Sequence, residues 1–199
     1  GMEGQQFEWQ RLNQLTVAPT LPGCVPIFRA LALPAVYAIS NASEAGVEAY
    51  LQQLGRALKQ GLKLVQVREK NMPAAECADF ARRVVELAHA HGAQVLINRD
   101  AALATQVGAD GVHLTGEQLA QCEERPAFAL VAASTHSRAE IERAAALKLD
   151  FAVLGAVHAT ASHPGQAPLG WPQFAEIVAA APLPVYALGG MKMADLRDA

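Results

Sequence analysis

The sequence is poor in cysteine, in positive charge and in long apolar runs, and each shortage excludes a class of protein. Cys24, Cys77 and Cys122 stand far apart, without the spacing of a zinc site or a disulfide framework, which is typical of a reducing cytoplasm. No apolar run reaches the roughly 18 residues that span a bilayer, and we expect no signal peptide. A formal net charge of -3 offers no basic footprint. We expect a cytoplasmic protein that binds neither membrane nor nucleic acid, as a monomer or a small homo-oligomer.

Two stretches of the 199 residues differ in composition and in hydrophobic pattern. Residues 1–33 carry Pro19, Pro22 and Pro26, a spacing that prevents a long helix and leaves too little sequence for a separate core. We therefore predict an N-terminal extension over residues 1–33 and one domain over residues 34–199.

From Pro34 onward, short apolar runs alternate with segments of helical spacing. The predicted strands are 35–39, 62–68, 94–98, 111–114, 130–134, 151–155 and 185–188. The predicted helices are 43–60, 73–92, 101–107, one from 117, 137–147, 171–180 and one begun by the last residues. Strands that each precede a helix predict an α/β fold, a TIM (β/α)8 barrel truncated before its eighth strand. A doubly wound open sheet is the alternative, but no G-x-G-x-x-G follows the first strand.

Polar side chains stand at alternate positions where the very apolar second strand ends: Gln66, Arg68 and Lys70. Alternate residues of a strand share a face, and barrels place their chemistry at the carboxyl ends of the strands. The arrangement predicts a site for an anionic small molecule inside the barrel mouth, with Arg68 as a planar fork and Lys70 as a point charge. The alternative is a strand end that runs out into solvent.

Paired glycines, Gly189 and Gly190, follow the seventh strand, where barrels commonly bind phosphate. Their backbone N–H groups can converge on an oxyanion, although a plain tight turn has the same sequence. Together with Arg68 and Lys70, the pair predicts a phosphorylated ligand.

The remaining candidates come from the other strand ends. His136 follows the fifth strand and titrates near neutrality, so it can take and return a proton; a helix-start histidine with only local hydrogen bonds is the alternative. His113 shares a face with Gly111 and is expected to fill the barrel interior. The loop 157–165 predicts a lid; its histidines, His158 and His163, have no carboxylate or cysteine at ligand spacing, so we expect no metal site. Further ligand-binding candidates are Asn98, Ser134 and Thr160.

Five motifs in order resemble the signatures of the thiamine phosphate synthase/TenI superfamily, over about Pro34 to the end of the chain. They are Gln66-Val67-Arg68-Glu69-Lys70, Ile97-Asn98, Ala109-Asp110-Gly111-Val112-His113-Leu114, Ser134-Thr135-His136-Ser137 and Ala187-Leu188-Gly189-Gly190-Met191. The resemblance implies a (β/α)8 barrel that binds thiazole phosphate. For synthases it also implies a pyrimidine diphosphate with magnesium.

Three positions depart from the synthase pattern. Arg99 and Gln118 stand where synthases carry the aspartates that bind magnesium, and His163 stands where they carry a lysine for pyrophosphate. A guanidinium in place of a carboxylate inverts the local charge. The retained motifs fit the TenI-like branch, whose members isomerise a carboxylated thiazole phosphate with a histidine base that matches His136. This reaction implies no cofactor; magnesium is expected only for a synthase with altered ligands such as Asp100.

The residues before Pro34, especially 12–26, resemble the tail of a MutT-like Nudix hydrolase. The resemblance implies that this chain is the second domain of a Nudix–TenI fusion, covalently linked to a Nudix domain. Three functions stay open: a thiazole tautomerase, a thiamine phosphate synthase with altered metal ligands, and a non-catalytic regulatory domain that binds thiazole phosphate or thiamine phosphate.

Overall fold

The computed structural model describes the chain except for residues 1–9, 11–15, 17–22, 161–166 and 198–199. The chain divides into two units, Gly1–Leu33 and Pro34–Ala199. The first contains a helix that the sequence analysis did not predict, α1 (Cys24–Ala32). Its only proline, Pro26, lies in the first turn, where a helix tolerates one. Most of the segment likened to a Nudix tail lies outside the described residues.

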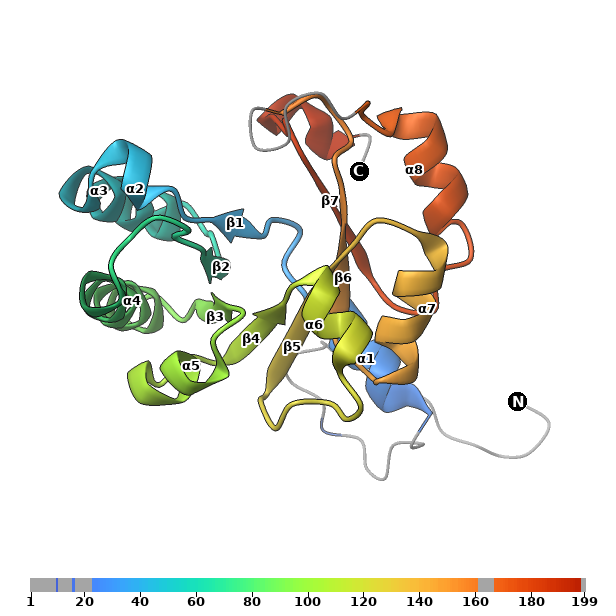
Figure 1. Cartoon of the computed structure of the whole chain (residues 1–199), viewed down its shortest axis with the longest axis horizontal. Helices are drawn as coiled ribbons and strands as arrows, with labels where there is room; N and C mark the ends of the chain where they lie inside the picture. The colour runs from blue at the N-terminus through green and yellow to red at the C-terminus, as the bar shows by residue number, and fades with distance from the viewer. Residues whose placement is uncertain (1–9, 11–15, 17–22, 161–166, 198–199) are drawn as a thin grey trace. The chain divides into compact units, whose positions relative to one another are not determined.

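The second unit is built on one parallel sheet whose strands follow each other in chain order (Figure 1). The strands are β1 (Ala38–Ile39), β2 (Leu64–Val67), β3 (Gln94–Asn98), β4 (Gly111–Leu114), β5 (Leu130–Thr135), β6 (Phe151–Gly155) and β7 (Val185–Leu188). A doubly wound sheet would reverse its strand order partway, so that alternative is wrong. Seven parallel strands in unbroken order confirm the predicted barrel fold, truncated before an eighth strand within the described residues.

Helices follow the strands as the sequence predicts, with two differences. They are α2 (Ala42–Ala45), α3 (Val47–Lys59), α4 (Ala74–His89), α5 (Ala101–Val107), α6 (Gly116–Gln121), α7 (Arg138–Ala146), α8 (Gly170–Val178) and a closing 3-10 turn, η1 (Met193–Arg197). The predicted helix 43–60 is wrong as one element, because Gly46 takes φ 84° and ψ 140° and divides it into α2 and α3. The predicted strand 35–39 shortens to β1, because only Ala38 and Ile39 pair with β2.

The two faces of the sheet have different roles. Outward-facing Val65 and Val67 belong to the apolar layer beneath α3 and α4, with Leu54, Leu58 and Phe80. On the inner face, the ring of Phe151 lies 5.1 Å from that of Tyr37 and 5.0 Å from that of Tyr186 (centroid distances). Tyr37 precedes β1 and Tyr186 belongs to β7, so the sheet curls far enough to bring side chains from its two edges together.

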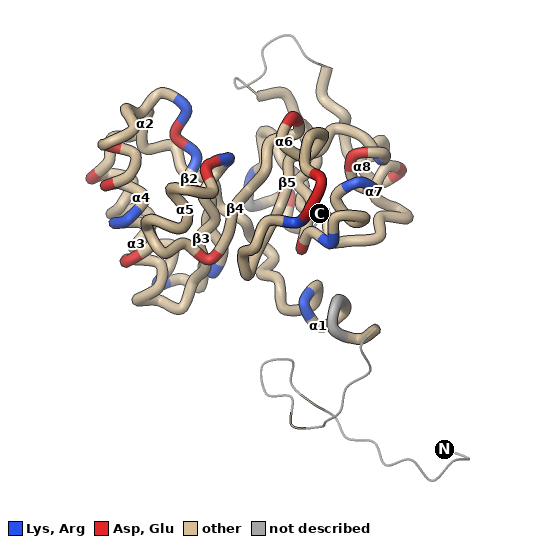
Figure 2. The backbone as a smooth tube through the Cα atoms, turned by 60° about the horizontal axis from the view of Figure 1, so that its bottom comes forward, with Lys and Arg blue, Asp and Glu red and all other residues tan. Residues whose placement is uncertain are grey.

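Charge is mixed over the second unit: Lys and Arg are interspersed with Asp and Glu (Figure 2). Among the described residues, no helix is both long and apolar enough to cross a membrane.

At the amino ends of the strands, aspartates tie neighbouring strands together. Asp110 accepts a hydrogen bond from the backbone N–H of Val95, and Asp150 accepts one from Val131. Arg125 donates to the Asp150 carboxylate at 2.7 Å, and the Asp150 side chain is only 5% exposed. Gly111, which follows Asp110, has no room for a Cβ atom, which would lie 2.0 Å from the Leu130 carbonyl oxygen.

We predict that Arg125→Ala lowers the free energy of unfolding by about 3 kcal/mol, because it removes the guanidinium that donates to the buried Asp150 carboxylate. Urea unfolding measures the change. The control is Asp79→Ala, which removes an exposed ion pair with Arg82 and should cost less than about 1 kcal/mol. Equal losses in the two variants would contradict a structural role for the Arg125–Asp150 pair.

Candidate functional site

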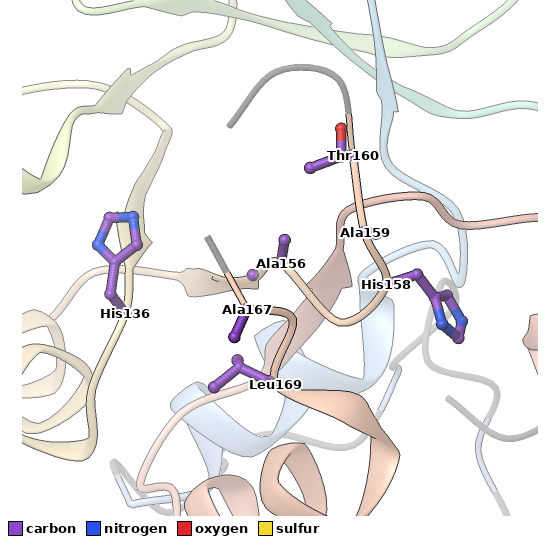
Figure 3. Close-up of a pocket in the computed structure, with 8 residues that line it drawn as sticks. His136, Ala156, His158, Ala159, Thr160, Ala167 and Leu169 are labelled. Carbon is purple, nitrogen blue, oxygen red and sulfur yellow. The ribbon is translucent and has the colours of Figure 1, made fainter. Parts of the chain in front are cut away.

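A pocket of about 160 Å³ lies at the carboxyl edge of the sheet, beside the loops that follow β5 and β6 (Figure 3). Figure 3 shows His136 and Thr160 on opposite sides of it, while the ring of His158 turns away. The lining residues are His136, Gly155, Ala156, His158, Ala159, Thr160, Ala167 and Leu169. Parallel barrels carry their chemistry at this edge, which makes the pocket the candidate site.

His136 is held at the pocket by the start of α7. Ser137 is the N-cap of α7 and accepts a hydrogen bond from the Glu140 backbone N–H. The Glu140 carboxylate in turn accepts from the His136 backbone N–H and lies 3.4 Å from its Nδ1. The backbone is thus satisfied locally, yet the His136 side chain stays 61% exposed and its Nε2 has no partner among the described residues. That nitrogen is therefore available to hydrogen-bond a bound molecule.

Gly189 and Gly190 bring the chain after β7 against the loop after β6. Their φ angles are 101° and 63°, a region that favours glycine. A Cβ on Gly189 would lie 2.5 Å from that of Ala156, and one on Gly190 would lie 2.8 Å from that of His158. The Gly189 carbonyl accepts a hydrogen bond from the His158 N–H at 3.0 Å. The glycine pair therefore borders the His136 pocket, because Ala156 and His158 line it.

We predict that Gly189→Ala destabilises the fold more than Gly108→Ala does. Both glycines have positive φ, but a Cβ on Gly108 meets nothing within 4 Å. Gly108→Ala should cost about 1–2 kcal/mol of backbone strain, and Gly189→Ala about 1–3 kcal/mol more, because it also overpacks the loop. Urea unfolding of both variants measures the difference. An equal loss of stability would contradict the prediction, because it would show that the loop after β6 moves aside at no cost in free energy.

A second group of polar side chains lies inside the barrel. Gln66 Nε2 donates to the Tyr37 hydroxyl at 2.9 Å, and this hydroxyl lies 3.2 Å from His113 Nδ1. His113 Nε2 lies 2.9 Å from Ser134 Oγ. His113 and Gln66 are each 2% exposed, which confirms that His113 fills the interior. Gln66 and Ser134, both predicted ligand-binding residues, thus belong to one hydrogen-bond chain with Tyr37, which the sequence analysis missed.

The other predicted residues lie near these hydrogen-bonded side chains or at the rim of the barrel. Arg68 is half-buried and makes no ion pair with another described residue, and its charge helps to lower the pKa of His113. Asn98 pairs in register with His113 at the end of β3. Lys70 is exposed. The pocket-lining set includes neither Arg68 nor Lys70.

Glu69, from the same motif, was not predicted as a functional residue, and it holds the mouth of the barrel together. Its carboxylate accepts hydrogen bonds from the hydroxyl of Ser40 and from the backbone N–H groups of Ala42 and Ser43, the latter two at 2.8 Å. Although partial burial acts to raise it, these bonds leave the pKa of the Glu69 carboxyl below its usual value. Glu69 therefore ties the end of β2 to the start of α2.

The positions at which synthases bind magnesium do not fit a cation. Arg99 has φ 59°, and its carbonyl accepts a hydrogen bond from Gln118 Nε2 at 2.8 Å. Gln118 Oε1 accepts from the Thr115 N–H as part of a capping box, so both ends of this amide are engaged. Asp100 Oδ1 accepts from the Leu103 N–H as the N-cap of α5. In the described residues no three His, Cys, Asp or Glu gather as metal ligands, and His163 lies outside them, as does most of the predicted lid.

The burial of His113 predicts a specific pH dependence. Burial, and then the charge of Arg68, lower its pKa from 6.5 to about 3. Below about pH 6.5 the unfolded chain therefore binds a proton that the folded protein does not, so stability falls as the pH falls. The effect of Glu69, whose pKa is also lowered, begins only below its unfolded value of 4.5.

We expect the wild-type melting temperature to fall between about pH 6.5 and pH 5, and the fall to be smaller in His113→Asn. Thermal unfolding at several pH values measures both slopes. His91→Asn, which removes a histidine at the amino edge of the sheet, serves as the control. A slope unchanged by His113→Asn would show that this histidine takes up its proton without unfolding.

Fold and geometry together define a parallel β/α-barrel protein with a small-molecule pocket at its carboxyl edge. The model of the family described as thiamine monophosphate synthase matches residues 36–199. The chain belongs to this family, which confirms the resemblance read from its motifs.

Relatives agree with this assignment. The "Putative thiamine-phosphate synthase" of Geobacter sulfurreducens is 34% identical over 168 residues, which cover 82% of this chain and 79% of the relative. The thiamine-phosphate synthase of Gloeobacter violaceus is 36% identical over 144 residues, or 71% of this chain and 42% of the relative. The solved thiamine phosphate pyrophosphorylase from Pyrococcus furiosus has the same fold, with a TM-score of 0.66 at 24% identity over 81% of this chain and 78% of that one. The Nudix fusion, the oligomeric state and the cytoplasmic location stay predictions.

Proposed function

We propose that this domain binds a carboxylated thiazole phosphate at the carboxyl edge of its barrel and isomerises it to the aromatic tautomer without a metal ion. The observation that carries the proposal is the placement of His136: an exposed imidazole at a pocket bordered by Gly189 and Gly190. Membership of the thiamine monophosphate synthase family supports a phosphorylated small molecule as the ligand.

The substrate carries two anionic groups, and the chain offers two kinds of partner for them. Backbone N–H groups near Gly189 and Gly190 are suited to the phosphate, with Thr160 on the far side of the pocket. The half-buried guanidinium of Arg68 is suited to the carboxylate. Lys70 lies at the rim of the barrel, and Asn98 is paired in register with the buried His113.

The reaction needs one proton to be moved. His136 Nε2 takes a proton from the ring carbon, and the electron pair of that C–H bond moves into the ring system. The exocyclic carbon then takes the proton back from the imidazolium, and the ring becomes aromatic. Atoms and charge balance with no co-reactant, and Glu140 beside Nδ1 stabilises the transient imidazolium.

A second candidate, thiamine phosphate synthesis, is favoured by the names of the relatives. It would join the ring nitrogen of a thiazole phosphate to the methylene carbon of a pyrimidine diphosphate, and pyrophosphate would leave with magnesium. The Gln118 amide, which is engaged at both ends, and the guanidinium of Arg99 argue against it. Its support is therefore the family, whereas the support for the tautomerase is the site itself.

We predict that His136→Ala slows isomerisation at least about 100-fold, the usual contribution of a positioned acid/base group, while the affinity for the thiazole phosphate changes little. The ultraviolet spectrum of the thiazole reports the rate, and calorimetry reports the affinity. The control is His91→Ala, because His91 lies at the opposite, amino edge of the sheet and should leave the rate unchanged.

Other outcomes distinguish the alternatives. Equal rates in wild type and His136→Ala would remove this histidine from the mechanism. Thiamine phosphate formation that depends on added magnesium and stops with chelator would favour the synthase. Binding of thiazole phosphate or thiamine phosphate without turnover of any substrate would favour a regulatory domain.

A further inference from the structure

The interior chain of Gln66, Tyr37, His113 and Ser134 has a direction. An amide nitrogen can only donate, so the Tyr37 oxygen accepts from Gln66 Nε2 at 2.9 Å. The single proton of the phenol is then available for His113 Nδ1, 3.2 Å away. Nδ1 is therefore the acceptor of this ring.

Neutral imidazole carries one proton, and here it must be on Nε2. The low pKa of His113 keeps the ring neutral near pH 7, because it is buried and Arg68 is nearby. With Nδ1 as acceptor, Nε2–H donates to Ser134 Oγ at 2.9 Å. The proton of the Ser134 hydroxyl is then left over, since within the described residues no further acceptor binds it.

Ser134 lies on the strand that leads to the pocket, although the pocket-lining residues do not include it. It belongs to the carboxyl end of β5, two residues before His136, and its side chain is only partly buried. Its backbone carbonyl oxygen and the His136 ring would both lie within 3.7 Å of a Cβ atom added to Gly116, so this glycine lies close to both. The chain of hydrogen bonds thus runs from the barrel interior toward the proposed catalytic histidine.

Burying a chain of polar side chains costs free energy, which indicates that this hydrogen-bond chain has a function. Barrel interiors are filled mainly by branched apolar side chains, and a buried polar network is favourable only when every member is satisfied. No described buried side-chain nitrogen or oxygen lacks a partner. An apolar layer would hold the barrel equally well, but it would not orient a hydroxyl.

We propose that Tyr37 and His113 are positioning residues that fix the Ser134 hydroxyl as a hydrogen-bond donor to the bound ligand. The inference rests on the proposed function, because it places the ligand at this edge of the barrel. It also specifies the ligand class: a heterocycle whose edge toward Ser134 presents an acceptor, such as a carboxylate oxygen or an unprotonated ring nitrogen. A ring with an N–H at that position is rejected, since two donors would meet.

The first test needs no ligand. Nitrogen-15 NMR of the histidines in the free protein near pH 7 should show His113 neutral, with the proton on Nε2. Tyr37→Phe removes the donor to Nδ1 and should shift His113 toward the other tautomer. Tyr186→Phe is the matched control, because its hydroxyl belongs to the same aromatic cluster but donates to the Pro34 carbonyl instead. A wild-type His113 with the proton on Nδ1 would overturn the inference.

The second test uses thiazole phosphate carboxylate as the probe in calorimetry. Ser134→Ala and Tyr37→Phe should each weaken binding about tenfold, the worth of one hydrogen bond, and Tyr186→Phe should not. The double variant Tyr37→Phe/Ser134→Ala should bind no more weakly than Ser134→Ala alone, because Tyr37 acts through Ser134. Losses that simply add would overturn the positioning role. No binding by wild type would end the proposed function and the ligand half of this inference, whereas the tautomer result would still decide the direction of the chain.

Discussion

Polar groups inside a closed apolar layer must find partners, and this constraint shapes the centre of the molecule. Gln66 faces inward because its neighbours Val65 and Val67 belong to the outer layer under the helices. Once Gln66 is inside, its amide donates to the Tyr37 hydroxyl, and His113 continues the chain with Nδ1 beside that hydroxyl and Nε2 beside Ser134. The hydrogen-bond chain ends on Ser134, two residues before the histidine proposed to move a proton. Burial in the core and chemistry at the rim are thus parts of one arrangement.

The same need for hydrogen-bond partners explains the arrangement of Arg99 and Gln118, which stand where synthases carry magnesium-binding aspartates. Gln118 uses its amide twice, once to cap α6 and once to hold the Arg99 carbonyl. A carboxylate at this position could not donate the second bond. The two substitutions therefore belong together: an arginine that adopts positive φ, and an amide that holds its backbone. This corner is therefore structural in this domain, which agrees with the metal-free reaction proposed above.

Much of the fold could be predicted because it depends on local patterns. The strands 94–98, 111–114, 151–155 and 185–188 were located to the residue, since apolar runs and the turns after them are short-range signals. The division of the helix at Gly46 was missed, because a glycine within helical spacing is often tolerated. Tyr37 was missed for a different reason. Its partners Gln66 and His113 are 29 and 76 residues away, and only the curled sheet brings them together. The glycine pair was found as a motif, but its close contact with the loop after β6 depends on the fold.

The central claim is that one ligand is held between the glycine pair, His136 and the interior chain. Titration of the nitrogen-15-labelled protein with thiazole phosphate carboxylate, followed by backbone amide NMR, tests it most directly. The account predicts saturable shifts at Gly189, Gly190, Thr160 and His136, together with the residues around Ser134, and none at the amino edge near His91. Shifts confined to other surfaces, or saturable shifts at the glycines that leave β5 untouched, would contradict it.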